Sequence, residues 1–134
     1  MITSNQNQLI KEIQLLQKKK KERIKRQQFI VEGLRAVKEI PTSWNIDKYI
    51  VAESYMTNTH HIIKNSDASV CYVSDSIFKN ITDTQTPQGI MAIVSYPRYN
   101  LEDIIFSKQG FFIIGDDIQD PGNLGTLIRT AHAA

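Results

Sequence analysis

Two stretches of the sequence hold residues whose types and spacing could do chemistry. The first, DPGNLGTLIRTA at residues 120–131, joins a two-glycine bend to a helical pattern that carries one arginine, Arg129. Its proline and first glycine suit a type II turn, and Asn123 suits the helix N-cap. Gly125 costs a helix about 1 kcal/mol relative to alanine, so its place one turn before Arg129 predicts that a ligand or another chain approaches the backbone. The alternative is an ordinary turn and helix with a solvated arginine.

The second stretch is KKKKERIKR at residues 18–26, where the positive charge of the chain is concentrated. Seven basic residues and one acidic residue give it a charge of +6, which leaves −4 for the rest of a chain whose total is +2. Such a cluster attracts phosphates, which favours RNA as the partner over the alternative of a solvated helix face. The candidate RNA-binding residues are Lys18, Lys19, Lys20, Lys21, Arg23, Lys25 and Arg26.

Other features narrow the possible functions. Neither the P-loop nor the GxGxxG fingerprint fits residues 120–131, which argues against a P-loop NTPase and against a dinucleotide-binding protein. His60 and His61 lack a third ligand at metal spacing, so no metal site is expected. Cys71 lies in an apolar run and is predicted to be a buried core thiol, and Trp44 is expected to pack at a sheet edge more readily than to stack on a base. Without a spanning apolar run or a secretory signal, a cytoplasmic location off the membrane is expected.

Hydrophobic patterning predicts the elements that position these residues. Apolar residues at spacings of three and four predict a helix over 6–28. Apolar runs predict strands over 29–31, 49–51, 70–73 and 89–95. The segments between them predict helices over 34–40, 54–64 and 75–81. Residues 1–97 are therefore expected to form an α/β sandwich domain.

A second domain is expected over residues 98–134. A linker at 96–100 and a short helix at 101–106 precede a run at 110–115 that is apolar on both faces, as in a buried parallel strand. The helix that follows is expected to bury Leu124, Leu127, Ile128 and Ala131.

Three motifs resemble parts of one enzyme family. Residues 116–131 closely resemble the first conserved motif of the SpoU (TrmH) family of RNA 2'-O-methyltransferases. FIVEG at 29–33 and TPQGIMA at 86–92 are similar to two stretches of the small substrate-binding domain that often precedes the catalytic domain. The resemblance spans roughly residues 9–134. It implies a domain like ribosomal protein L30e over 1–97, then the first strand and helix of a knotted α/β methyltransferase domain over 98–134, in an enzyme that is usually a homodimer.

The resemblance also implies a function. Arg129 and Asn123 stand where the family has its essential arginine and an asparagine, so Arg129 is expected to position the ribose 2'-hydroxyl that takes a methyl group from S-adenosylmethionine. Ribosomal RNA is the expected substrate ahead of tRNA. The two later motifs that hold the cofactor would follow Ala134, so the chain is expected to be an inactive fragment. The alternatives are a non-catalytic L30e-like RNA-binding module and a dimerisation or assembly fragment, which the coding sequence beyond Ala134 would distinguish.

Overall fold

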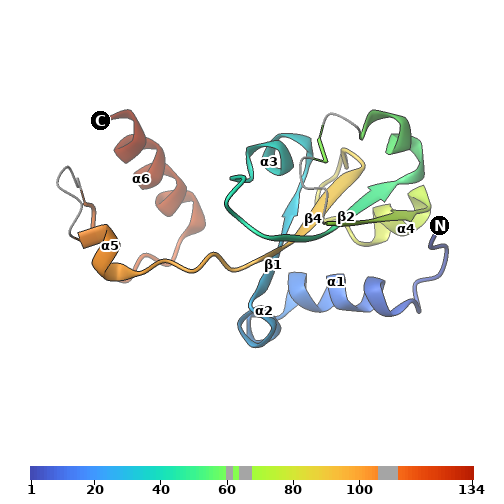
Figure 1. The fold of residues 1–134 in the computed structure, drawn as a ribbon, viewed down its shortest axis with the longest axis horizontal. Helices are drawn as coiled ribbons and strands as arrows, with labels where there is room; N and C mark the ends of the chain where they lie inside the picture. Colours follow the sequence, from blue (N-terminus) through green and yellow to red (C-terminus); the bar gives the residue numbers. More distant parts are fainter. Residues whose placement is uncertain (60–61, 64–67, 106–111) are drawn as a thin grey trace. The chain divides into compact units, whose positions relative to one another are not determined.

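The computed structural model describes residues 1–59, 62–63, 68–105 and 112–134. The chain divides into two compact units, Met1–Pro97 and Arg98–Ala134, which are called the N-terminal unit and the C-terminal unit below. Figure 1 shows a sheet flanked by helices in the N-terminal unit and helices in the C-terminal unit. Among the described residues, none of the helices combines the length and apolar character that a bilayer crossing requires.

The N-terminal unit is built on a four-stranded sheet with the strand order β1-β4-β2-β3. Its strands are β1 (Gln28–Glu32), β2 (Ile46–Ala52), β3 (Ser69–Val73) and β4 (Ile90–Ser95). β4 runs antiparallel to both β1 and β2, whereas β2 and β3 are parallel. The two central strands, β2 and β4, supply most of the buried positions, because both of their faces are covered. All four predicted strands are confirmed.

Helices cover both faces of this sheet, which confirms the predicted α/β sandwich (Figure 1). On one face, α1 (Gln8–Lys18) and α4 (Asp75–Asn80) pack Ile10, Ile13, Leu16 and Phe78 against the sheet. On the other face, α3 (Leu34–Glu39) packs Val37.

Two predicted helices differ from the structure. The helix expected over 6–28 breaks at Lys19, which is extended at φ −120° and ψ 106°, so that α2 (Lys20–Arg26) is a separate helix. The buried stripe of α1 ends at Leu16 and α2 buries no residue, so nothing holds a straight helix along the sheet. Over 54–64 the structure has a 3₁₀ helix, η1 (Glu53–Asn58), after which the Thr59 hydroxyl donates to the Met56 carbonyl at 2.9 Å. Residues 60–61 and 64 lie outside the described residues.

Asp47 joins three strands at one end of the sheet, beside an irregularity in the β2–β4 register. Its carboxylate accepts hydrogen bonds from Gln28 Nε2 at 2.8 Å, Asn45 Nδ2 at 2.7 Å and Ser95 Oγ at 2.9 Å. Replacing Asp47 with alanine leaves these donors without their acceptor, so we expect the free energy of unfolding to fall by about 2 kcal/mol in urea titrations. Glu53→Ala, at an exposed carboxylate, should change it by less than about 0.5 kcal/mol. Equal effects would mean that the network adds nothing.

The C-terminal unit contains α5 (Leu101–Ile105) and α6 (Pro121–Ala133) and, among its described residues, no fully buried side chain. The buried strand predicted at 110–115 is wrong for the residues described there: 112–114 form no strand, and Ile114 is 92% exposed. A strand needs a hydrogen-bonded neighbour, and the described part of this unit contains none.

The apolar face of α6 is also more open than predicted. Leu124 is 43% exposed and Ile128 is 59% exposed, because a unit this short cannot enclose a core. Apolar residues instead line an open hollow of about 480 Å³, namely Ile113, Gly115, Ile118, Leu124, Leu127, Ile128 and Ala131.

Candidate functional site

Arg23 links the two basic helices. Its Nη1 donates to the carbonyl oxygens of Leu16 at 2.7 Å and Gln17 at 2.9 Å. Carbonyl groups in the last turn of a helix have no partner within that helix, so the guanidinium supplies donors at the break at Lys19. Arg23 is half-buried and therefore stabilises the junction, whatever else it binds.

Arg26 is also engaged within the chain. Its Nη1 lies 2.8 Å from Glu12 Oε1, and its Nε lies 3.4 Å from Glu22 Oε2. Two carboxylates thus offset its charge. Of the seven predicted RNA-binding residues, the two arginines make contacts within the chain that stabilise the fold. The spacing of the residues in the sequence did not separate these arginines from the lysines.

The five lysines of the segment are called the lysine cluster: Lys18, Lys19, Lys20, Lys21 and Lys25. All are exposed, and the structure shows no ion pair between them and the described carboxylates. Their ammonium groups flank the break between α1 and α2. Five unneutralised cations on so short a segment can bind consecutive phosphates of a nucleic acid.

The helix that carries Arg129 begins earlier than predicted. Asp120, and not Asn123, is the N-cap: its Oδ1 accepts the backbone N–H of Asn123 at 2.7 Å. Pro121 occupies the first helical position, where no N–H is needed, so the predicted type II turn is replaced by the first turn of α6. Asn123 is exposed on that turn.

The guanidinium of Arg129 lies against its own helix at Gly125. A methyl group at Gly125 would stand 3.2 Å from Arg129 Nη1, so the glycine leaves room for this side chain. Arg129 Nη2 donates to Thr126 Oγ1 at 3.1 Å, and Thr126 Oγ1 donates to the Gly122 carbonyl at 2.9 Å. The group that lies beside Gly125 in the structure is a side chain of the same helix, and the approach of a ligand or another chain stays a prediction. Thr126 was missed, although its spacing of three from Arg129 could have indicated it.

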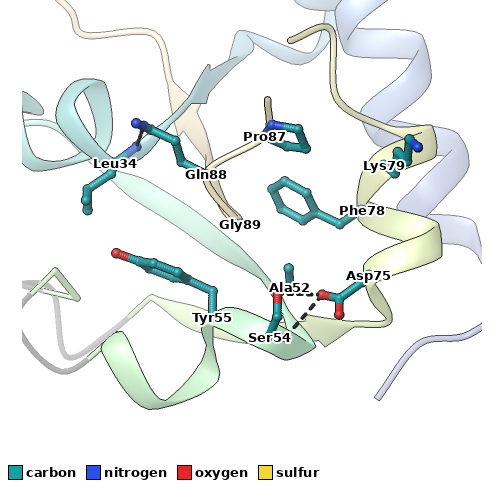
Figure 2. A pocket seen from close by; sticks show the side chains of 10 residues that line it. All are labelled: Leu34, Ala52, Ser54, Tyr55, Asp75, Phe78, Lys79, Pro87, Gln88 and Gly89. Carbon is teal, nitrogen blue, oxygen red and sulfur yellow. Dashed lines mark hydrogen bonds between the residues drawn. The ribbon is translucent and has the colours of Figure 1, made fainter. Parts of the chain in front are cut away.

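Two of the sequence motifs meet at a pocket of about 530 Å³ in the N-terminal unit (Figure 2). Gln88 Oε1 accepts the backbone N–H of Leu34 at 2.7 Å, so a hydrogen bond joins the residue that follows FIVEG to TPQG. Gly33 at φ +95° and Gly89 at φ +73° both adopt conformations that favour glycine. Figure 2 shows Tyr55, Phe78 and Pro87 around the pocket, with Asp75 bonded to Ser54 at its rim. The motif glycines are thus explained by close packing.

The remaining predicted residues have smaller roles. Cys71 is half-buried and not buried as predicted, because it lies on β3, an edge strand of the sheet. Trp44 packs edge-on against Phe29 with ring centroids 6.0 Å apart, which confirms a packing role. His60 and His61 lie outside the described residues. Within the described ranges, no three His, Cys, Asp or Glu side chains are grouped as metal ligands.

A family model describes the N-terminal unit. Residues 7–92 match the MRM3-like substrate-binding domain, a range that contains the whole four-stranded sheet except the last residues of β4. The chain belongs to this family of substrate-binding domains.

The relatives of the chain are methyltransferases of the SpoU (TrmH) family. It is 37% identical to the 23S rRNA (guanosine(2553)-2'-O)-methyltransferase RlmP of Bacillus subtilis, over 99% of this chain and 50% of the relative. It is 27% identical to the human mitochondrial rRNA methyltransferase 3, over 84% of this chain and 28% of that protein. A solved structure of an AdoMet-bound rRNA methyltransferase from Sinorhizobium meliloti is similar, with a TM-score of 0.68 and 26% identity over 98% of this chain and 50% of that one. The chain thus spans half or less of these three relatives.

Proposed function

We propose that this chain is the RNA-binding part, and the start of the methyltransferase domain, of an RNA 2'-O-ribose methyltransferase. In this proposal the N-terminal unit is the L30e-like substrate-binding domain, and its lysine cluster binds RNA. The C-terminal unit is the first segment of the knotted catalytic domain and supplies Arg129 and Asn123. The enzyme acts in the cytoplasm as a homodimer, on ribosomal RNA in preference to tRNA.

The observation that carries the proposal is the family match over residues 7–92, with rRNA methyltransferases among the relatives. The structure adds physical support at both ends of the chain. Five exposed lysines suit a phosphate backbone, and the Arg129 guanidinium is oriented by Thr126 and lies against its own helix at Gly125.

Arg129 would act by binding and orientation. A guanidinium stays protonated at neutral pH and has no lone pair to accept a proton, so it does not serve as a general base. Its remaining N–H groups can donate to the 2'-oxygen and a neighbouring phosphate, which holds the nucleophile and stabilises the negative charge that develops on it. Asn123, six residues earlier on α6, would orient Arg129 or the local backbone.

The described residues do not by themselves form a site for S-adenosylmethionine. The residues that line the 480 Å³ hollow beside α6 have apolar side chains or none, so no side chain there offers a polar partner to the amino, carboxylate and adenine groups of the cofactor. The cofactor, which would supply the methyl group, is therefore assigned to the part of the relatives that this chain does not span.

Removing charge from the lysine cluster tests the RNA-binding part of the proposal. With Lys20 and Lys21 both changed to glutamine, we expect the Kd for short single-stranded RNA to rise on the order of tenfold, measured by fluorescence anisotropy across a salt series. The slope of log affinity against log salt should fall in magnitude by about 1.4, or 0.7 for each lost phosphate contact.

The matched control removes the same charge from α3, on the opposite face of the sheet, by changing Arg35 and Lys38 to glutamine. Its salt slope should remain close to that of the unaltered chain. If both double variants weaken RNA binding equally, net charge alone explains the effect, and the lysine cluster is only a solvated helix face.

A further inference from the structure

A second hollow, of about 330 Å³, lies next to the lysine cluster on the α1 side of the sheet. Its walls come from the end of α1, from α2, from β1 and from the segment after α4, and they include Leu16, Arg23, Ile30, Glu32 and Asp83. Leu16 and Ile30 are apolar, whereas the other three carry charges. No two of these charged side chains form an ion pair with each other.

Two polar groups of this hollow, the Arg23 guanidinium and the Glu32 carboxylate, are held by hydrogen bonds within the chain. Arg23 is fixed through Nη1 alone, which leaves the other donors of its guanidinium without a described partner. The Glu32 carboxylate accepts from the Thr82 hydroxyl, from Thr84 Oγ1 at 2.9 Å and from the Asp83 N–H at 3.3 Å. The Asp83 side chain is exposed and makes no hydrogen bond to the described residues.

The free edge of β1 adds a backbone donor and acceptor. β1 is the first strand of the sheet and, among the strands that the structure describes, pairs only with β4. Gly33 donates to the Ile90 carbonyl at 3.0 Å, and the Gln27 carbonyl accepts from Tyr96 at 2.8 Å, so the odd-numbered residues of this strand bond to β4. In an antiparallel ladder the residues between them point the other way. The N–H and C=O of Ile30 therefore point outward along this edge.

We propose that this hollow binds an unpaired guanine base of the RNA whose phosphates lie on the lysine cluster. The Watson–Crick edge of guanine carries adjacent N–H donors at N1 and N2, which match a carboxylate, and its Hoogsteen edge carries acceptors at O6 and N7, which match an arginine. One guanine can thus bridge Asp83 and Arg23, with Ile30 against the ring. Adenine lacks this donor pair, and inosine lacks the N2 amine. This inference rests on the proposed RNA binding and adds a base preference to it.

The test compares otherwise identical single-stranded RNAs that carry guanine, inosine or adenine at one central position. We expect the unaltered chain to bind the guanine probe on the order of tenfold more tightly than the other two. Asp83→Asn should abolish this preference, because an amide cannot accept both N–H groups. Glu53→Gln makes the same charge change at an exposed site in η1 and should retain the preference.

Two results would overturn the inference: equal affinity for the three probes, or a preference that survives Asp83→Asn. If the chain binds RNA without base preference, only the guanine site fails. If none of the probes binds, even at low salt, the proposed RNA binding fails together with the guanine site.

Discussion

Replacing Arg129 with alanine should lower kcat for methyl transfer by roughly 10²–10³, the loss typical of removing a donor that stabilises developing negative charge. The assay uses a chimera in which this chain replaces the segment that it matches in the Bacillus subtilis relative. Transfer of a labelled methyl group to 23S rRNA gives the rate. Since the lysine cluster is intact, RNA affinity should change little, and the loss should appear in kcat more than in KM.

Two further variants separate position from charge. Arg129→Lys keeps the charge but loses the planar fork of donors, so it should restore little activity. Gly125→Ala should stabilise α6 by about 1 kcal/mol, yet its methyl group would stand 3.2 Å from Nη1 and displace the guanidinium. We therefore expect Gly125→Ala to be more stable and less active. Full activity in Arg129→Ala would exclude the proposed role, and full activity in Gly125→Ala would show that the orientation seen here is not the one used.

The sheet of the N-terminal unit could be predicted because its strands are apolar runs whose signal is local. β4 and the second half of β2 are buried and read as continuous apolar segments, and the motif glycines lie directly after β1, at Gly33, and directly before β4, at Gly89. The break at Lys19 could not be read in the same way. It depends on Arg23 reaching back to Leu16 and Gln17, a contact set by three-dimensional geometry and not by periodicity.

The candidate sites show the same limit. Charge alone located the basic segment, but only the structure separates the paired Arg26 from the exposed lysines. The hollow beside them unites Arg23, Glu32 and Asp83, and Glu32 meets its threonine partners across fifty residues of sequence or more. The apolar run before α6 gave a wrong prediction of a buried strand. Apolar composition predicts burial only when a neighbouring element is present to cover it.

A single methyl group at Gly89 should destabilise the N-terminal unit by roughly 2–5 kcal/mol. Gly89 has φ +73°, a conformation that costs an alanine about 1–2 kcal/mol. An added methyl group would also stand 2.7 Å from Tyr55 Cβ, which is anchored to the backbone and cannot rotate away, so overpacking adds about 1–3 kcal/mol. Urea unfolding of Gly89→Ala, followed by the fluorescence of Trp44, the single tryptophan of the chain, measures the loss in this unit.

Gly33→Ala is the matched control, because Gly33 also has a positive φ, of +95°. Its methyl group would stand 3.2 Å from Gln88 Oε1, the end of a flexible side chain that can move. Gly33→Ala should therefore lose only the conformational part, about 1–3 kcal/mol for a backbone at φ +95° and ψ 149°, and a larger loss in Gly89→Ala reports the contact with Tyr55. Equal losses of unfolding free energy would show that the junction of β2 and η1 moves to accommodate the added methyl group. The close approach of Gly89 to Tyr55 would then add nothing to the stability of the N-terminal unit.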